Sequence, residues 1–132
     1  MKNVNYSIVK QVSSNYTKTV ERITKALADQ GFGVLTQIDI AATLKKKIDV
    51  DYPRTIILGA CNPPIAYKAL TAVPDIAVLL PCNVVVRENQ QKEVEIVAMD
   101  PMILSHLMDN PEVNAIAADV DQRIRAAINS VE

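Results

Sequence analysis

The sequence predicts an α+β fold of two layers, which begins strand–helix–strand and closes with a β-hairpin and a long helix. The opening unit is expected over residues 4–40, the hairpin over 83–99 and the final helix over 111–130. Alternating apolar residues mark the strands, and apolar residues three and four apart mark the helices. The final helix is the longest amphipathic element, so we expect it to cover the sheet.

Length and composition limit the class of protein. At 132 residues the chain is expected to form a single domain, residues 1–132. Hydrophobic residues make up 49% and aromatic residues only 4%, so the core must consist of Val, Ile, Leu and Ala. The formal net charge of −1 argues against nucleic acid or an anionic membrane as the partner. The start of the chain has no apolar run typical of a secretion signal, and no window approaches 18 continuous apolar residues, so we expect a soluble cytoplasmic protein.

The opening unit is read from hydrophobic spacing and capping residues. Residues 4–12 alternate and predict a strand, and Ser13 or Ser14 is the expected N-cap of the next helix. Gly31 is the expected left-handed stop of that helix. Residues 32–40 predict a second strand. Residues 41–48 predict a short helix with three lysines at its C-terminal end, which are expected to lie in solvent; the alternative is contact with a phosphate or an acidic partner.

The chain is organised around residues 54–67. Residues 55–60 predict a buried strand that runs directly into a helix opening at Pro63 and Pro64. Residues 76–80 are expected to begin another strand, which Pro81 interrupts. The hairpin strands are expected at residues 83–88 and 93–99. Asp100-Pro101 and Asn110-Pro111 are each expected to open a helix, with the Asp or Asn side chain as cap, as Asn62-Pro63 does.

The junction between the central strand and its helix holds the candidate site. Cys61 and Asn62 lie just before a helix start, where backbone N–H groups and the positive end of the helix dipole favour an anion or a thiolate. Asn62 and Pro63 would bind a ligand there, and Gly59 would let a ligand or another backbone approach closely. The alternative interpretation is that Cys61 is a small buried hydrophobic residue, which is usual for a free cysteine.

Cys82 is the second candidate for chemistry. It could meet Cys61 if the intervening chain folds back, and would then act as a resolving thiol. Their spacing is far from the C-x-x-C of redox and metal sites. No metal site is expected, because His106 is the only histidine, and we expect it to lie at the surface or to be satisfied by hydrogen bonds. The sequence identifies no cofactor and leaves open whether the protein is an enzyme.

Several segments together resemble a known family. They are GACNPPIAYKAL, PDIAVLLPCNVVV, EIVAMDP, the first helix ending in GFGV, and IDIAATLKKKI. The chain is similar to an uncharacterised prokaryotic family, the domain of unknown function numbered 302, over essentially its whole length. Its most typical motif matches Cys61, Asn62 and Pro63. The resemblance implies a TATA-binding-protein-like topology, with a curved antiparallel sheet, a long C-terminal helix across it, and homodimers. It implies no activity.

Three functions remain open from the sequence. The leading hypothesis is a small dimeric domain that binds a small ligand, with an anion as one candidate, where Cys61, Asn62 and Pro63 open the helix. The second is thiol-based redox or sulfur-carrier chemistry by Cys61 with Cys82. The third is a protein-interaction domain in which the motif is only a packing device, and an exposed apolar patch away from the motif would favour it.

Overall fold

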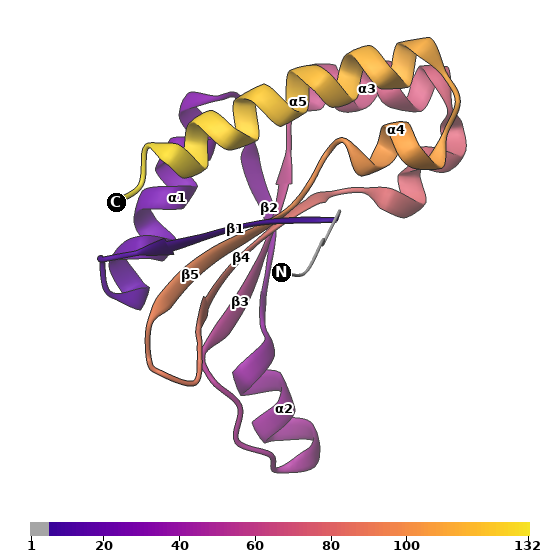
Figure 1. Ribbon diagram of the computed structural model, residues 1–132. Helices are drawn as coiled ribbons and strands as arrows, with labels where there is room; N and C mark the ends of the chain where they lie inside the picture. The colour runs from indigo at the N-terminus through magenta and orange to yellow at the C-terminus, as the bar shows by residue number, and fades with distance from the viewer. Residues whose placement is uncertain (1–5) are drawn as a thin grey trace.

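The computed structural model describes residues 6–132 and consists of one curved sheet of five antiparallel strands with most helices on one side (Figure 1). The strand order is β1-β5-β4-β3-β2. The strands are β1 Ser7–Val12, β2 Gly33–Asp39, β3 Thr55–Cys61, β4 Cys82–Glu88 and β5 Val94–Met99. The helices are α1 Tyr16–Asp29, α2 Ile40–Ile48, α3 Pro63–Ala72, the 3-10 helix η1 Pro74–Leu79, α4 Ile103–Leu107 and α5 Pro111–Asn129.

The predicted α+β fold is confirmed, including the strand–helix–strand opening, the hairpin and the long final helix. Of the first predicted strand, residues 4 and 5 lie outside the described residues, and β1 begins at Ser7. The two strands of the opening unit are not neighbours. They form the opposite edges of the sheet, so α1 carries the chain from one edge to the other.

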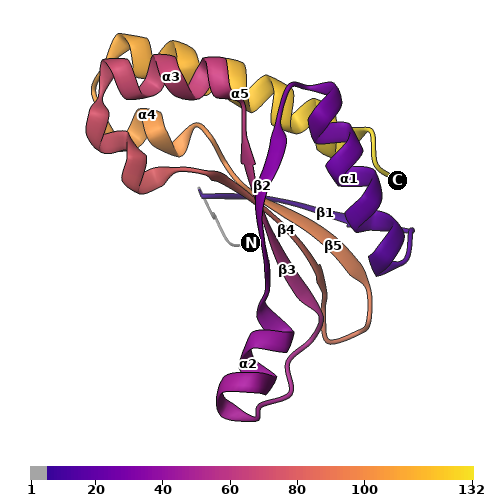
Figure 2. The same ribbon diagram turned by 180° about the vertical axis from the view of Figure 1, so that it is seen from behind.

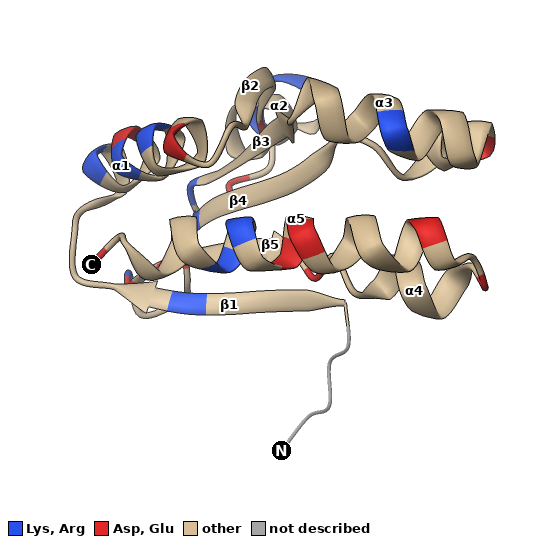
Figure 3. Ribbon diagram, turned by 90° about the horizontal axis from the view of Figure 1, so that it is seen from above, with Lys and Arg blue, Asp and Glu red and all other residues tan. Residues whose placement is uncertain are grey.

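One face of the sheet forms the main core. Its side chains pack against α1 and α5, and α5 crosses β5 when the molecule is viewed from above (Figure 3). The largest fully buried side chains of the sheet are Leu58, Val84, Val86 and Ile96, which pack in one cluster with Ile23, Leu27, Ile124 and Ile128 from the two helices. Ile23, Leu27 and Ile124 belong to the apolar stripes that the sequence predicts, whereas Ile128 was not part of the predicted stripe.

A second, smaller core lies beyond the end of the sheet. The first half of α5 packs there against α3, η1 and α4, through Val113, Ala117, Ala69, Ile76 and Leu104. Ile116 packs against both cores. Helix α5 therefore bridges a sheet-backed core and a purely helical one.

Most of the helices begin at a residue whose side chain caps the first turn. Asn15 caps α1 by accepting the Lys18 N–H (2.8 Å), whereas the predicted cap Ser14 donates its hydroxyl to the Glu132 carbonyl (2.8 Å). The cap prediction was wrong by one or two residues because the serine binds the C-terminal segment instead. Gly31 has a φ of 87°, as expected for the left-handed stop. Asn110 caps α5 as predicted.

The prediction of a strand at residues 76–80 was wrong. Residues 74–79 form the 3-10 helix η1, which has Pro74 in its first turn. Ile76 is buried in the helical core, while Val78 is 85% exposed. Proline at a helix start fixes φ and removes only an unused donor, so it favours this short helix over a strand. Likewise α4 begins at Ile103 rather than directly at Pro101, after a turn in which Asp100 accepts the Met102 N–H.

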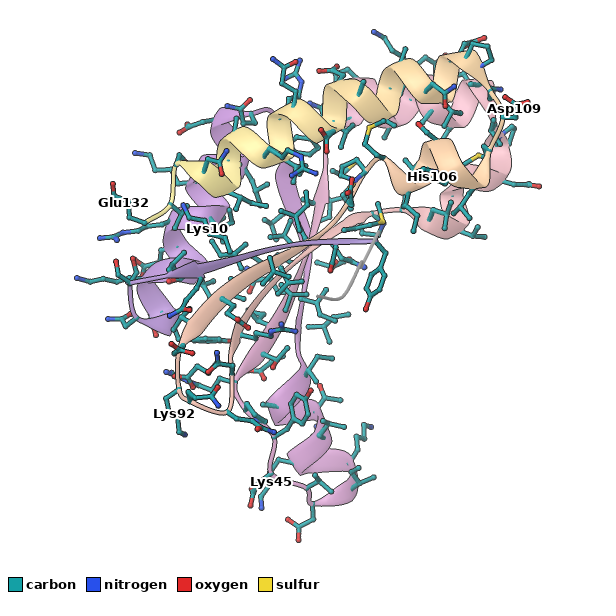
Figure 4. All side chains as sticks on the ribbon, in the orientation of Figure 1. Lys10, Lys45, Lys92, His106, Asp109 and Glu132 are labelled. Carbon is teal, nitrogen blue, oxygen red and sulfur yellow. The ribbon has the colours of Figure 1, made fainter. Side chains whose placement is uncertain are left out.

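The two ends of the molecule are held differently. The Lys10 ammonium group donates to the Ile128, Asn129 and Val131 carbonyls at the end of α5, where the helix dipole is negative (Figure 4). At the far end, Lys45 on α2 pairs with Asp49 (3.0 Å) and Asp51 (3.2 Å) in solvent. No residue of α2 is buried.

Candidate functional site

The predicted junction exists with the predicted local geometry. Cys61 is the last residue of β3, and Asn62 is the N-cap of α3. The Asn62 side chain is 8% exposed, and its Oδ1 accepts the Ile65 N–H (3.2 Å). A Cβ added to Gly31 would lie only 2.8 Å from the Asn62 Nδ2, which is too close for a side chain at that position. The glycine that ends α1 thus leaves room for the amide that begins α3.

The start of α3 has no free backbone donors among its first helical residues. Pro63 and Pro64 lack an N–H, and the Ile65 N–H is bound by the Asn62 side chain. The Ala66 N–H donates to the Asn62 carbonyl (2.8 Å). Anion sites at helix starts depend on such unpaired N–H groups. The geometry therefore gives little support to an anion as the ligand.

Gly59 is packed against neighbouring side chains. A Cβ placed on it would overlap the Thr36 hydroxyl and would lie 2.9 Å from Pro81 Cγ. Thr36 is its paired residue on β2, and Pro81 directly precedes β4. The close approach that the sequence predicted is thus made, in this structure, by two side chains of the chain itself.

Beside the junction lies an apolar cavity of about 300 Å³, which we call the α3 cavity. It lies between the two cores, where Phe32, Ala60 and Val120 of the main core face Ala69, Ile76 and Leu104 of the helical core. Cys61, Asn62 and Cys82 also line it, and none of its described lining residues is charged. Pockets of this size and character hold small molecules through apolar contact, with a few polar groups for orientation.

The structure brings Cys61 and Cys82 to the same cavity but gives Cys82 little thiolate character. Both are half-buried free cysteines. Burial, and then the nearby Cys61, raise the pKa of the Cys82 thiol to about 11. Cys82 pairs with Ala60, so Cys61, one residue further along β3, starts from the opposite face of the pleat.

A larger hollow of about 660 Å³ lies at the other end of the sheet, between the loop before β3 and the hairpin turn. Its arginine is already paired, because Arg54 donates to both carboxylate oxygens of Glu88 (2.9 and 3.2 Å) and lies over the Tyr16 ring. The pair holds the pKa of Glu88 below its usual range, mainly through this hydrogen bond. Arg54 is thus neutralised by Glu88, and Lys92 is the other cation of the lining.

His106 is exposed on α4, as expected of a surface histidine (Figure 4). Among residues 6–132, no group of three or more histidine, cysteine or acidic residues could hold a metal ion. No helix in that range is long and apolar enough to cross a membrane.

Comparison with known proteins identifies the family. The family model described as "Domain of unknown function DUF302" matches residues 8–131. The chain belongs to the DUF302 family. The crystal structure of an uncharacterized conserved DUF302 protein from Bacillus stearothermophilus is similar, with 29% sequence identity and a TM-score of 0.90. The likeness covers 98% of this chain and 100% of that one. No curated protein matches.

The other residues that line the α3 cavity were not predicted from the sequence. Its main contributors, such as Phe32, Leu104 and Ile116, are apolar residues in helices or at strand ends. Such residues have the same sequence pattern whether they fill a core or line a hollow. The buried Asn62 was the one detectable signal, because an Asn-Pro pair marks a helix start.

Proposed function

We propose that this DUF302 protein binds a small, mainly apolar and uncharged molecule in the α3 cavity. The observation that carries the proposal is the uncharged lining of a cavity of about 300 Å³ beside the family motif. The first three helical residues of α3 offer no free N–H, which removes the main physical reason for an anionic ligand. Asn62 supplies the amide at this wall, so one neutral oxygen on the ligand fits the polarity of the site.

The thiol hypothesis has less support. A nucleophilic or resolving cysteine needs its thiolate, and burial keeps the Cys82 thiol protonated well above neutral pH. The interaction hypothesis is favoured by a separate observation, because the side of the sheet away from α1 and α5 exposes apolar residues such as Val9 and Ile38.

Two probes with the same chain and different head groups test the ligand proposal. Binding of 1-octanol and of octanoate is measured by chemical-shift titration of the amide signals. We expect 1-octanol to shift signals from residues lining the α3 cavity, and octanoate to bind at least several-fold more weakly. Stronger binding of octanoate would show that the site prefers an anion. If neither probe binds, the proposal is overturned.

A pair of matched variants locates the binding. Ala66 is half-buried on α3 and lines the cavity, so Ala66→Leu should fill part of it and weaken 1-octanol binding. Ala118 is exposed on α5 and lies outside the lining, so Ala118→Leu makes the same change without consequence for binding. Equal affinities for the two variants would place the ligand elsewhere.

A further inference from the structure

Asn62 has one polar atom that its own helix does not use. Its Oδ1 accepts the Ile65 N–H (3.2 Å) as the cap of α3, whereas no group in residues 6–132 accepts a hydrogen bond from its Nδ2. The cap also fixes which way the amide points, because exchanging the two atoms would place an NH₂ group against the Ile65 N–H. Asn62 is more than nine-tenths buried, so the unpaired atom is a donor in a buried site. Buried polar groups of folded proteins are usually paired, because an unpaired one costs free energy.

The surroundings of Asn62 Nδ2 supply space and a second donor. Because β2 and β3 are adjacent antiparallel strands, the start of α3 lies beside the end of α1 (Figure 2). Gly31 lies there and has no side chain that could accept. Arg123 of α5 also lies close to Gly31, but its Nη1 is itself a donor, to the Gln30 carbonyl (3.1 Å). These neighbours therefore do not supply the acceptor that Nδ2 requires.

The unpaired amide belongs to the wall of the α3 cavity. Asn62 lines this cavity, and Thr36, the other hydroxyl or amide side chain of the lining, is exposed. Ser105 Oγ is the one side-chain polar atom in the described part of the chain that is both sealed and unpaired, so Asn62 Nδ2 keeps a surface that a ligand can reach. The thiols of Cys61 and Cys82 are only weak hydrogen-bonding groups. The cavity thus offers a ligand a buried, unpaired donor, while the amide oxygen is turned to the helix start.

We propose, building on the ligand binding proposed above, that the α3 cavity selects a carbonyl compound, such as an aliphatic ketone, whose oxygen accepts a hydrogen bond from Asn62 Nδ2. A carbonyl oxygen satisfies this donor and brings no donor of its own. An alcohol also accepts, but its own O–H then needs an acceptor within an apolar wall, and an unsatisfied buried donor is costly. Asn62 is therefore the residue that determines the specificity of the cavity.

Two ligands with the same carbon skeleton test this selection. The ketone 2-octanone and the alcohol 2-octanol differ in whether the oxygen also donates, and the binding of each is measured at pH 8 by chemical-shift titration of the amide signals. We expect the wild type to bind the ketone at least about threefold more tightly, which is within the range of one net hydrogen bond.

Asn62→Asp converts the donor into an acceptor. Aspartate keeps an oxygen that caps α3, and its second carboxylate oxygen replaces Nδ2. The variant should reverse the preference, because the alcohol O–H gains a partner and the ketone oxygen faces another oxygen. Asn110→Asp makes the same change at the Asn-Pro cap of α5, where Asn110 is half-buried and outside the cavity lining, and it should keep the preference of the wild type.

Thermal unfolding shows which variants are folded. Asn62→Ser serves if Asn62→Asp is not folded, because serine also caps a helix and lacks the amide nitrogen, and it should abolish the preference. If the wild type binds both ligands without preferring the ketone, or if the folded Asn62 variant keeps the preference, the selection is overturned while ligand binding in the cavity stands. If neither ligand binds the wild type, both proposals are overturned.

Discussion

The protonation of Cys82 offers the sharpest test of the candidate site. With its pKa at about 11, against the usual value of 9.0, Cys82 is about 0.1% thiolate at pH 8, whereas an ordinary cysteine is about 10%. A thiolate becomes about threefold more nucleophilic for each unit by which its pKa is raised, so two units increase the rate constant of the thiolate about tenfold. Alkylation of Cys82 at pH 8 should therefore be about tenfold slower than that of a free thiol, before any protection by the cavity wall.

The measurement uses Cys61→Ser, which leaves Cys82 as the only thiol of the chain. The rate of iodoacetamide modification is followed from pH 7 to pH 11, in the native protein and in guanidinium chloride. The native rate should keep rising to about pH 11, whereas the denatured rate should level off near pH 9. If the native protein reacts as fast as the denatured chain and levels off near pH 9, the burial argument is refuted and the thiol hypothesis regains support.

Three further predictions follow from packing, capping and titration. Gly59→Ala should destabilise the fold by about 1–3 kcal/mol through overlap with Thr36 and Pro81, while Gly33→Ala, with nothing within 4 Å of its Cβ, should change stability by less than about 0.5 kcal/mol in urea unfolding; equal effects would contradict the packing argument. Lys10→Met should lower stability by about 1–2 kcal/mol, because three carbonyls at the end of α5 lose their donor; a neutral result would mean that water replaces the ammonium group without cost. Because the folded pKa of Cys82 is raised, its contribution to stability is present below about pH 9 and is lost as pH rises to about 11, by about 2–3 kcal/mol relative to Cys82→Ala; parallel pH curves for the two proteins would exclude the shift.

Local sequence was sufficient for most elements. The stripe through Ile23 and Leu27, and the caps at Asn62 and Asn110, depend on residues three or four apart, and local spacing determines such contacts. The same applies to Gly31, whose positive φ only glycine adopts without strain. The prediction from local sequence was wrong at residues 76–80, because a buried Ile76 two residues after Pro74 is compatible with both a strand and a 3-10 helix. Burial in the helical core decided between them.

The sequence by itself determined most of the strands and helices and the position of the Cys61-Asn62-Pro63 junction, because these follow from spacing and backbone chemistry. Only the tertiary structure decided that β1 and β2 lie at opposite edges, that an apolar cavity opens beside the junction, and that Cys82 is half-buried in its wall. Each of these depends on contacts between segments far apart in the chain, and hydrophobic periodicity does not encode which segments meet.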